Sequence, residues 1–220
     1  TILSSSFAQH RGELPKPYTY GRNGTPTSAA FEGAVADIYG AESCISTPSG
    51  LAALTTALLA FTKSGDHMLF PDQLYGSTRR FVTNMLPMMG IEPEFYPARI
   101  DGDISGYIRP STSLIFVESP GSLTFELQDL PAIVKAARHQ TKTANPITIM
   151  VDNTWGTALH YPVLQLGADV VIEAATKYIC GHSDISLGIA AASGIHGKAL
   201  KQTAKNLGIC AGPDDLYAGL

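Results

Sequence analysis

Two apolar runs, each followed at once by polar residues, decide the fold of this chain. Residues 147–155 read Ile-Thr-Ile-Met-Val-Asp-Asn-Thr-Trp, and residues 170–177 read Val-Val-Ile-Glu-Ala-Ala-Thr-Lys. A run that is apolar at nearly every position is typical of a strand buried on both faces, as in a parallel sheet covered by helices. Outward from these runs, short apolar segments alternate with longer amphipathic ones, which predicts the α/β class.

The alternation places each expected element on the chain. We predict seven strands, over Cys44–Thr47, Met68–Phe70, Glu94–Tyr96, Leu114–Glu118, Ile147–Val151, Val170–Glu173 and Ser186–Ala192. We predict helices from Thr27 to Gly40 and over Ser49–Thr62, Ser77–Met89, Leu130–Gln140, Val163–Leu166 and His196–Leu207. A last helix is expected after Gly212, with Asp214 or Asp215 as its N-cap.

The composition restricts the classes of function. Of the 220 residues, 15% are charged, against about 25% in typical soluble domains. Such a low charge content favours a surface covered by other subunits. The net charge of −4 excludes the basic footprint of a nucleic-acid binder. The longest apolar stretch, Leu51–Phe61, is too short to cross a bilayer, and the three cysteines form no CxxC pair. We therefore expect a cytoplasmic protein without membrane or nucleic-acid partners.

Polar residues that follow three of the predicted strands suggest a shared site, because ligands of α/β sheets bind at the carboxyl ends of the strands. Ser49-Gly50 opens a helix whose N-terminus can hold a phosphate, although Ser49 also suits a simple cap. Asp152 can pair with a cationic nitrogen, or it can cap a helix. Lys177 follows a buried strand among alanines, where desolvation makes an amine nucleophilic, although its head could instead reach water.

The three features together indicate one kind of ligand more specifically than each does alone. A phosphate cradle, a carboxylate and a lysine, each at a strand end, are the three anchors of pyridoxal 5′-phosphate (PLP). No metal site is expected. His182, Asp184 and His160 have no convincing ligand spacing, and a structural role in their loops is the simpler interpretation.

Four ordered motifs extend this hypothesis to a family. The chain contains Tyr18-Thr-Tyr-Gly-Arg-Asn-Gly-Thr25, Glu118-Ser-Pro-Gly-Ser122, Val151-Asp-Asn-Thr-Trp155, and Ala175-Thr-Lys-Tyr178 followed by Gly181-His-Ser-Asp184. It resembles the cysteine and methionine metabolism family of PLP enzymes from about Tyr18 to Leu220. The resemblance implies a three-layer α/β/α fold with a mostly parallel seven-stranded sheet, the aspartate aminotransferase type (fold type I).

The same resemblance implies a domain organisation. Residues 1–26 would form an N-terminal arm that contacts a neighbouring subunit, and residues 27–220 would form the large PLP-binding domain. The family's smaller C-terminal domain, with the arginine that grips the substrate carboxylate, would lie outside this chain. The family also implies a homo-oligomer, most simply a dimer of dimers.

By this resemblance, three residues carry the chemistry. Lys177 would be the lysine that binds PLP as a Schiff base and moves protons. Asp152 would pair with the pyridine nitrogen. Tyr75 would stack on the cofactor ring.

Five further positions would hold the phosphate. Gly50 and Leu51 would donate backbone N–H groups, and Thr176 would offer its hydroxyl. Tyr20 and Arg22 would reach across to the phosphate of a neighbouring subunit, where an arginine fork suits a phosphate.

Three details within the motifs resemble the bacterial cystathionine β-lyase branch: Ala174, Trp155 and Gly121-Ser122, where related γ-lyases have Ser, Phe and Asn-Pro. The implied reaction is β-elimination of L-cystathionine to homocysteine, pyruvate and ammonia, a step of methionine biosynthesis. The alternatives are cystathionine or methionine γ-lyase and cysteine desulfhydrase activity. A non-catalytic member of the fold, or an inactive fragment, is the alternative of another class.

Overall fold

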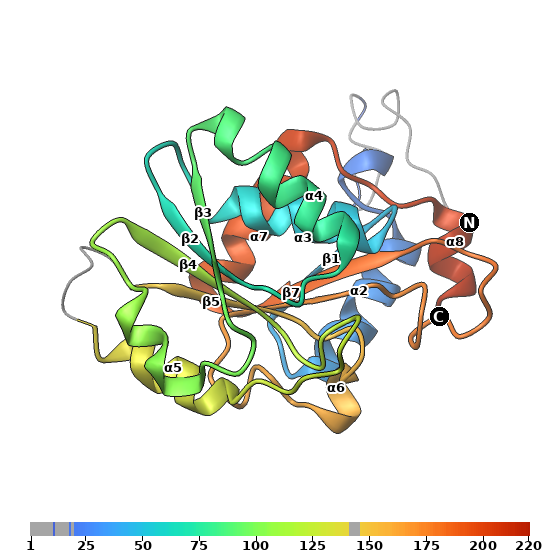
Figure 1. The fold of residues 1–220 in the computed structure, drawn as a ribbon. Helices are drawn as coiled ribbons and strands as arrows, with labels where there is room; N and C mark the ends of the chain where they lie inside the picture. The colour runs from blue at the N-terminus through green and yellow to red at the C-terminus, as the bar shows by residue number, and fades with distance from the viewer. Residues whose placement is uncertain (1–10, 12–17, 19, 141–145) are drawn as a thin grey trace.

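The computed structural model describes Arg11, Tyr18 and residues 20–140 and 146–220. One seven-stranded sheet forms its middle layer, with helices on both faces (Figure 1). The strands are β1 (Ser43–Thr47), β2 (His67–Pro71), β3 (Glu92–Tyr96), β4 (Thr112–Glu118), β5 (Thr148–Asp152), β6 (Val170–Glu173) and β7 (Gly188–Ala192). Their spatial order is β1-β7-β6-β5-β4-β2-β3.

The direction of the strands decides where a site can form. Strands β2 to β6 pair in parallel, whereas β7 is antiparallel to both of its neighbours, β1 and β6. Strand β1 therefore runs in the same direction as the parallel strands. The carboxyl ends of β1, β2, β4, β5 and β6 consequently lie along one edge of the sheet, and the loops that follow them share that edge.

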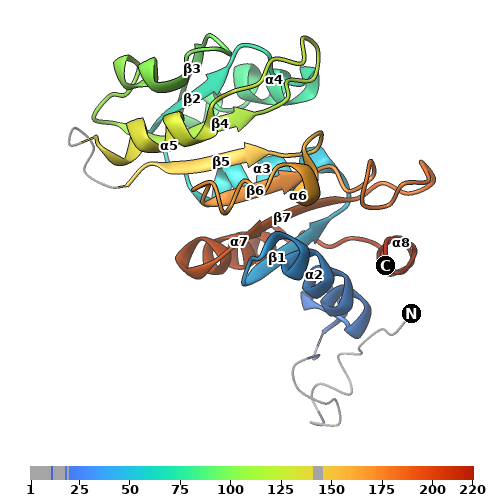
Figure 2. The same ribbon diagram turned by 90° about the horizontal axis from the view of Figure 1, so that it is seen from below.

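Helices cover each face and bury a separate apolar core. On one face lie α3 (Gly50–Ala60), α4 (Gly76–Asn84) and α7 (Gly194–Leu207), packed on alternate strand residues such as Phe70, Phe116 and Ile172. On the other face lie α2 (Pro26–Tyr39), α5 (Leu130–Arg138), α6 (Thr157–His160) and α8 (Pro213–Ala218). Figure 2 shows this second set of helices from below. Because the strand residues alternate between the two cores, the sheet is apolar on both faces.

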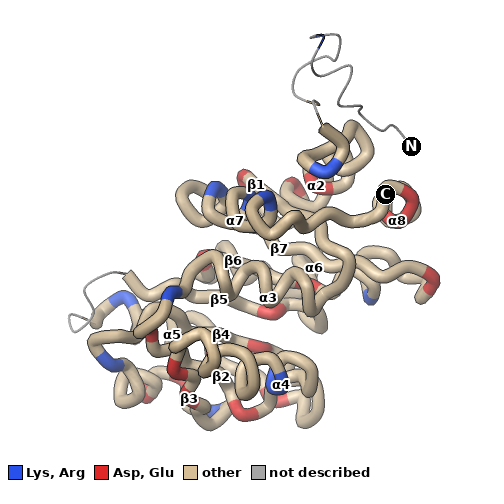
Figure 3. Tube along the Cα trace, turned by 90° about the horizontal axis from the view of Figure 1, so that it is seen from above, with Lys and Arg blue, Asp and Glu red and all other residues tan. Residues whose placement is uncertain are grey.

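Short 3₁₀ turns complete the elements: η1 (Gly21–Asn23), η2 (Pro87–Met89) and η3 (Asp101–Gly106). In the described residues no helix combines the length and the apolar character that a membrane crossing requires. Charged residues are dispersed along the described trace instead of forming a basic stripe (Figure 3).

The predicted α/β/α fold and all seven predicted strands are confirmed, with ends shifted by at most two residues. One predicted helix is absent, a second ends earlier than predicted, and one N-cap prediction was wrong. Residues 163–166 form a hydrogen-bonded turn that stops at Gly167, whose φ is +104°, and the short α6 precedes them. The helix predicted over Ser77–Met89 ends at Asn84, because Pro87 lies inside its span. Gly212, rather than Asp214 or Asp215, is the N-cap of α8.

The expected N-terminal arm falls mostly on residues 1–10, 12–17 and 19, which lie outside the described residues. Helix α2 starts one residue earlier than predicted, at Pro26. Thr25 caps it, because the Thr25 hydroxyl accepts the Ser28 N–H while the Ser28 hydroxyl accepts the Thr25 N–H. The predicted boundary after residue 26 falls at the first residue of this helix, and the division into arm and domain stays a prediction.

Candidate active site

An open hollow of about 800 Å³ lies at the carboxyl edge of the sheet. This volume is within the range typical of small-molecule sites. The hollow brings together six of the eight residues that the sequence predicted for the site: Gly50, Leu51, Tyr75, Asp152, Thr176 and Lys177. These residues follow β1, β2, β5 and β6, so the parallel order of the strands assembles them.

The N-terminus of α3 forms one wall, and glycines allow it to approach the neighbouring loop. Ser49 is the N-cap, and its hydroxyl accepts the Ala52 N–H at 3.1 Å. A Cβ on Gly50 would lie 2.6 Å from the Cβ of Ala174, and one on Gly188 would lie 2.2 Å from the Ser49 carbonyl oxygen. Since the first N–H groups of a helix have no partner inside it, those of Gly50 and Leu51 can bind an anion.

Asp152 ends β5 at the floor of the hollow. Its Oδ1 accepts the Thr154 N–H at 3.0 Å and the Thr154 hydroxyl at 2.6 Å. In the described part of the chain no hydrogen bond occupies Oδ2. Burial raises the pKa of Asp152, while the Thr154 bonds and the nearby Lys177 ammonium lower it. The carboxylate is thus held in one orientation with one oxygen left for a further cation.

Lys177 lies in the turn after β6, and it is the only lysine among the described residues that line the hollow. Its N–H donates to the Ala174 carbonyl at 2.9 Å, and its carbonyl accepts the Gly181 N–H at 2.8 Å. The side chain is exposed in this chain. The amine is therefore not desolvated in this chain alone. Lys177 lines the same hollow as Asp152 and Gly50, and its role there stays a prediction.

The hydroxyl of Thr176 has a different local role from the predicted one. It donates to the Leu187 carbonyl at 3.0 Å and accepts the Leu187 N–H at 2.8 Å. These two bonds clamp the turn after β6 to the start of β7. The single hydroxyl proton is therefore engaged within the chain, and the hydroxyl reaches a phosphate only if this proton changes partner.

Glu118, the last residue of β4, lines the hollow but received no role from the sequence. It pairs in register with Asp152 on the neighbouring strand and is buried. Its Oε2 accepts the Tyr75 N–H at 2.9 Å. Burial and the nearby Asp152 carboxylate raise the pKa of Glu118 to about 7. Its position at a strand end, inside a quoted motif, is the signal that could have identified it.

Glu173 ends β6 and is the second buried acid that the sequence did not single out. Its side chain lies on the opposite face of the sheet from Asp152, where the Tyr39 hydroxyl donates to Oε2. Burial raises the pKa of Glu173 to about 7, and Asp152 contributes to this rise. Glu173 does not line the hollow.

Aromatic side chains surround the mouth of the hollow. Trp155 makes an edge-to-face contact with Phe125, with ring centroids 5.2 Å apart, and its centroid is 6.4 Å from that of Tyr178. Trp155 and Tyr178 line the hollow, as does the exposed Leu123. The rim therefore offers an apolar surface beside the polar floor.

Tyr20 and Arg22 do not line the hollow of their own chain. The Arg22 guanidinium lies 5.4 Å from the centroid of the Tyr20 ring and donates to the Lys205 carbonyl at 3.2 Å. Their expected contact with the phosphate of another subunit stays a prediction.

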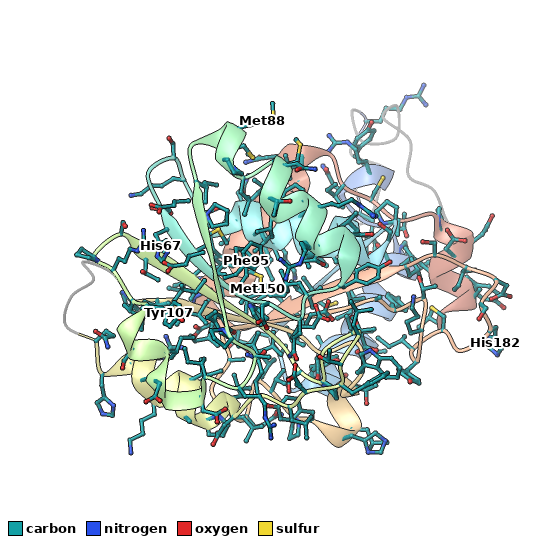
Figure 4. The ribbon with its side chains drawn as sticks, in the orientation of Figure 1. His67, Met88, Phe95, Tyr107, Met150 and His182 are labelled. Atoms are coloured by element: carbon teal, nitrogen blue, oxygen red, sulfur yellow. The ribbon has the colours of Figure 1, made fainter. Side chains whose placement is uncertain are left out.

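Within the described residues, no group of three or more His, Cys, Asp or Glu side chains could hold a metal ion. His182 and Asp184 are both exposed, and Figure 4 places His182 at the outer end of the loop between β6 and β7.

The strand-end lysine, the carboxylate and the glycine-lined helix start match one known family. The family model for Cys/Met metabolism PLP-dependent enzymes matches residues 1–220. The chain belongs to this family. Its enzymes depend on PLP, and an amino acid is the class of substrate that such an enzyme takes.

Three individual relatives show which named enzymes the chain is similar to. The chain is 45% identical over 201 residues to a Rhizobium johnstonii protein named as a candidate cystathionine beta-lyase, covering 91% of this chain and 49% of that protein. It is 36% identical to the cystathionine beta-lyase MetC of Escherichia coli, covering 90% of this chain and 49% of MetC. It is also 41% identical to an L-alanine/L-glutamate racemase of Wolbachia pipientis, covering 93% of this chain and 49% of the racemase.

A solved structure confirms the fold. The crystal structure of MetB from Corynebacterium glutamicum superposes with a TM-score of 0.88 at 28% identity, covering 100% of this chain and 55% of that one. The chain spans about half the length of these three relatives.

Proposed function

We propose that the protein containing this chain is a PLP-dependent carbon–sulfur lyase that performs β-elimination on L-cystathionine. The observation that carries the proposal is the meeting of Lys177, Asp152 and the Gly50 helix start around one hollow. Relatives named cystathionine beta-lyase at 35–38% identity support the choice of reaction. Ala174, Trp155 and Gly121-Ser122 support the same branch.

The described residues fit PLP at each of its three anchor points. Gly50 and Gly188 let the start of α3 pack directly against Ala174 and β7, where a Cβ on either glycine would collide with the chain. The N–H groups at this helix start are then held at the wall of the hollow, which suits a phosphate. Asp152 presents its open Oδ2 to a cationic ring nitrogen, and Lys177 supplies the amine. Tyr75, half exposed at the wall of the hollow, offers a ring for stacking.

When bound, PLP withdraws electrons from the α-carbon of an amino acid and so acidifies its α-proton. Lys177 takes this proton at Nζ and delivers a proton to the sulfur as the Cβ–S bond breaks. Thr154 keeps the Asp152 carboxylate oriented, and both Thr154 and Lys177 favour its ionised form. With one water consumed, cystathionine yields homocysteine, pyruvate and ammonia.

The racemase relative supports a second candidate function. Its identity of 41% lies between the 45% of the Rhizobium johnstonii protein and the 35–38% of the relatives named cystathionine beta-lyase. Racemisation also begins with removal of the α-proton. The two reactions differ in the destination of the proton, which returns to the α-carbon in a racemase and goes to sulfur in a lyase. The residues around Lys177 that face the substrate therefore decide between them.

Product analysis on the full-length protein loaded with PLP separates the candidates. Pyruvate and homocysteine from L-cystathionine support the proposal. Production of 2-oxobutyrate and cysteine instead would identify a γ-lyase, and D-alanine from L-alanine without lyase products would identify a racemase. Failure to take up PLP would identify a non-catalytic member of the fold.

We further propose that the protein is a cytoplasmic homo-oligomer in which Tyr20 and Arg22 reach a neighbouring subunit's phosphate. Their position outside the hollow of their own chain supports this arrangement. All three cysteines are free thiols, which suits a reducing compartment. Arg22→Ala should weaken PLP retention in the assembled protein, and unchanged retention would contradict the contact between subunits.

A further inference from the structure

Glu118 is a buried acid at the centre of the site that the proposed reaction does not use. It is 2% exposed, and its ordinary partners are missing: no ion pair joins it to a cation in the described residues. Burying a carboxyl group without a cation costs free energy unless hydrogen bonds compensate. The structure shows what these bonds connect.

Three donors converge on the Glu118 carboxyl group from two different loops. The Tyr75 N–H, at the start of α4, donates to Oε2 at 2.9 Å. The Ser122 N–H and hydroxyl, in the loop after β4, donate to Oε1 at 2.9 and 2.6 Å. Both loops wall the hollow, so one side chain ties two separate walls together.

The backbone of Glu118 is fixed as well. Its N–H donates to the Gln128 side-chain oxygen at 3.1 Å, and its carbonyl accepts the Gln73 amide at 2.8 Å. The carboxyl group is therefore a fixed point to which the Tyr75 and Ser122 loops are hydrogen-bonded. Rigid support of this kind keeps site residues in productive geometry.

The pattern of donors favours a carboxylate. Each oxygen accepts a backbone N–H group, and an ionised oxygen accepts such a bond more strongly than the oxygen of a neutral acid. A glutamine fits poorly, because its NH₂ group would face one of these donors. An ionised glutamate accepts all three bonds, which explains an acid at a position where charge is costly.

We infer that Glu118 is a positioning residue whose ionised carboxylate holds Tyr75 and Ser122 against the hollow. This inference rests on the proposed function for its effect on turnover, but the hydrogen bonds themselves can be tested without any reaction. The groups that face Glu118 are Asp152 from β5, Tyr96 from β3 and Tyr75 from the start of α4. Protonation of Glu118 as the pH falls through about 7 loosens the Tyr75 loop.

Hydrogen–deuterium exchange of the full-length protein, with and without PLP, tests the inference directly. In Glu118→Gln the Tyr75 and Ser122 amides should exchange roughly tenfold or more faster, because a charged acceptor is lost. Glu118→Asp, which keeps the carboxylate, should restore part of the protection. Glu173→Gln is the matched control: it removes a buried strand-end acid on the opposite face, and both amides should keep their protection.

Turnover gives a second readout. Glu118→Gln should lower kcat/KM by roughly tenfold to a hundredfold, while Lys177 still binds PLP. The fall of kcat/KM at low pH should also become smaller, because the variant has no carboxyl group at this position to protonate. Unchanged amide exchange in Glu118→Gln would overturn the inference. If this variant does not fold, the protection of the wild-type Tyr75 amide decides: a fall below about pH 7 supports the inference, and a flat profile overturns it.

If exchange changes as expected but no lyase products form, the positioning role stands and the proposed reaction fails. If lyase products form and exchange does not change, the reaction stands and the positioning role fails.

Discussion

At the amino-terminal edge of the sheet three acidic side chains, Glu92, Glu94 and Asp169, form ion pairs. At the carboxyl edge three acids have no ion pair among the described residues. Arg109 binds Glu92 at 2.6 Å and Glu94 at 2.5 Å, and His67 lies 3.0 Å from Glu94. Figure 4 shows His67 at the end of the sheet far from the His182 loop. Arg138 binds Asp169 just before β6, at 2.7 Å.

The acids at the carboxyl edge have no cationic partner in an ion pair among the described residues. Glu118, Asp152 and Glu173 end three adjacent strands, and burial raises the pKa of each. Charges that are neutralised within the chain contribute to the fold. Acids that lack a cation in the chain are poised for a ligand or for a local structural task, and they mark the functional edge.

The largest expected effect is at Lys177, the one lysine among the described residues that line the hollow. Lys177→Ala should abolish PLP attachment and lower turnover by roughly a thousandfold or more, because the amine that moves the proton is lost. Lys198→Ala, an exposed lysine of α7, is the control and should retain normal turnover. Steady-state kinetics of both variants checks this. Substantial turnover in Lys177→Ala would assign the chemistry to another group.

A matched pair of acids compares the two edges directly. Asp152→Asn should keep the fold but lower kcat by roughly a hundredfold, because a neutral amide does not stabilise a cationic nitrogen. Asp169→Asn, at the amino edge, should lower the Tm through its lost Arg138 pair and leave kcat unchanged. Kinetics and thermal melts of the two variants give the comparison. Equal losses of kcat in both would remove the distinction between the edges.

A methyl group added at Gly50 should displace the start of α3 at the carboxyl edge. Gly50→Ala places a Cβ 2.6 Å from the Ala174 Cβ, so it should cost about 1–3 kcal/mol of stability and weaken PLP binding roughly tenfold. Gly33→Ala in α2 has no atom within 4 Å of the new Cβ, and its PLP affinity should not change. Titration of the PLP-free variants followed by absorbance measures both. Normal PLP affinity in Gly50→Ala would argue against the cradle.

The smallest expected effect is on the pH dependence of stability, which should have opposite signs for His67 at the amino edge and Glu173 at the carboxyl edge. Burial and Arg109 lower the pKa of His67, so the unfolded chain takes up its proton first and stability falls as the pH drops below about 6.5. Burial raises the pKa of Glu173 from 4.5 to about 7, so stability is lost as the pH rises through that window.

Urea unfolding of the PLP-free protein across this pH range measures both slopes. His67→Gln should remove the loss of stability as the pH drops below about 6.5. Glu173→Gln should reduce the loss of stability as the pH rises from 4.5 to about 7, with the part caused by Glu118 remaining. The same slope change in both variants would contradict the assignment of opposite signs.

Much of the fold could be predicted because buried strands need near-continuous apolar runs. The predictions failed where the pattern is short or broken. The turn at residues 163–166 has helical spacing but only one turn's length before Gly167, and nucleation makes so short a helix unfavourable. The four-residue α6 is too brief for any periodicity to mark it.

The site was predictable residue by residue at strand ends, but the connections between those residues were not. The role of Glu118 depends on the register that pairs it with Asp152 and on bonds to Tyr75 and Ser122, which lie 43 and 4 residues away in the sequence. The engagement of the Thr176 hydroxyl depends on Leu187 across a loop. Such contacts are set by strand order, in which β7 inserts between β1 and β6, and the linear sequence does not display that order.

Borohydride reduction of the PLP-loaded full-length protein, followed by peptide mass mapping, reports which amine holds the cofactor. We expect the added mass of reduced PLP on the peptide containing Lys177, and its loss in Lys177→Ala. An adduct confined to any other lysine, or no adduct in a folded protein saturated with PLP, would contradict the assignment of this edge of the sheet as the active site.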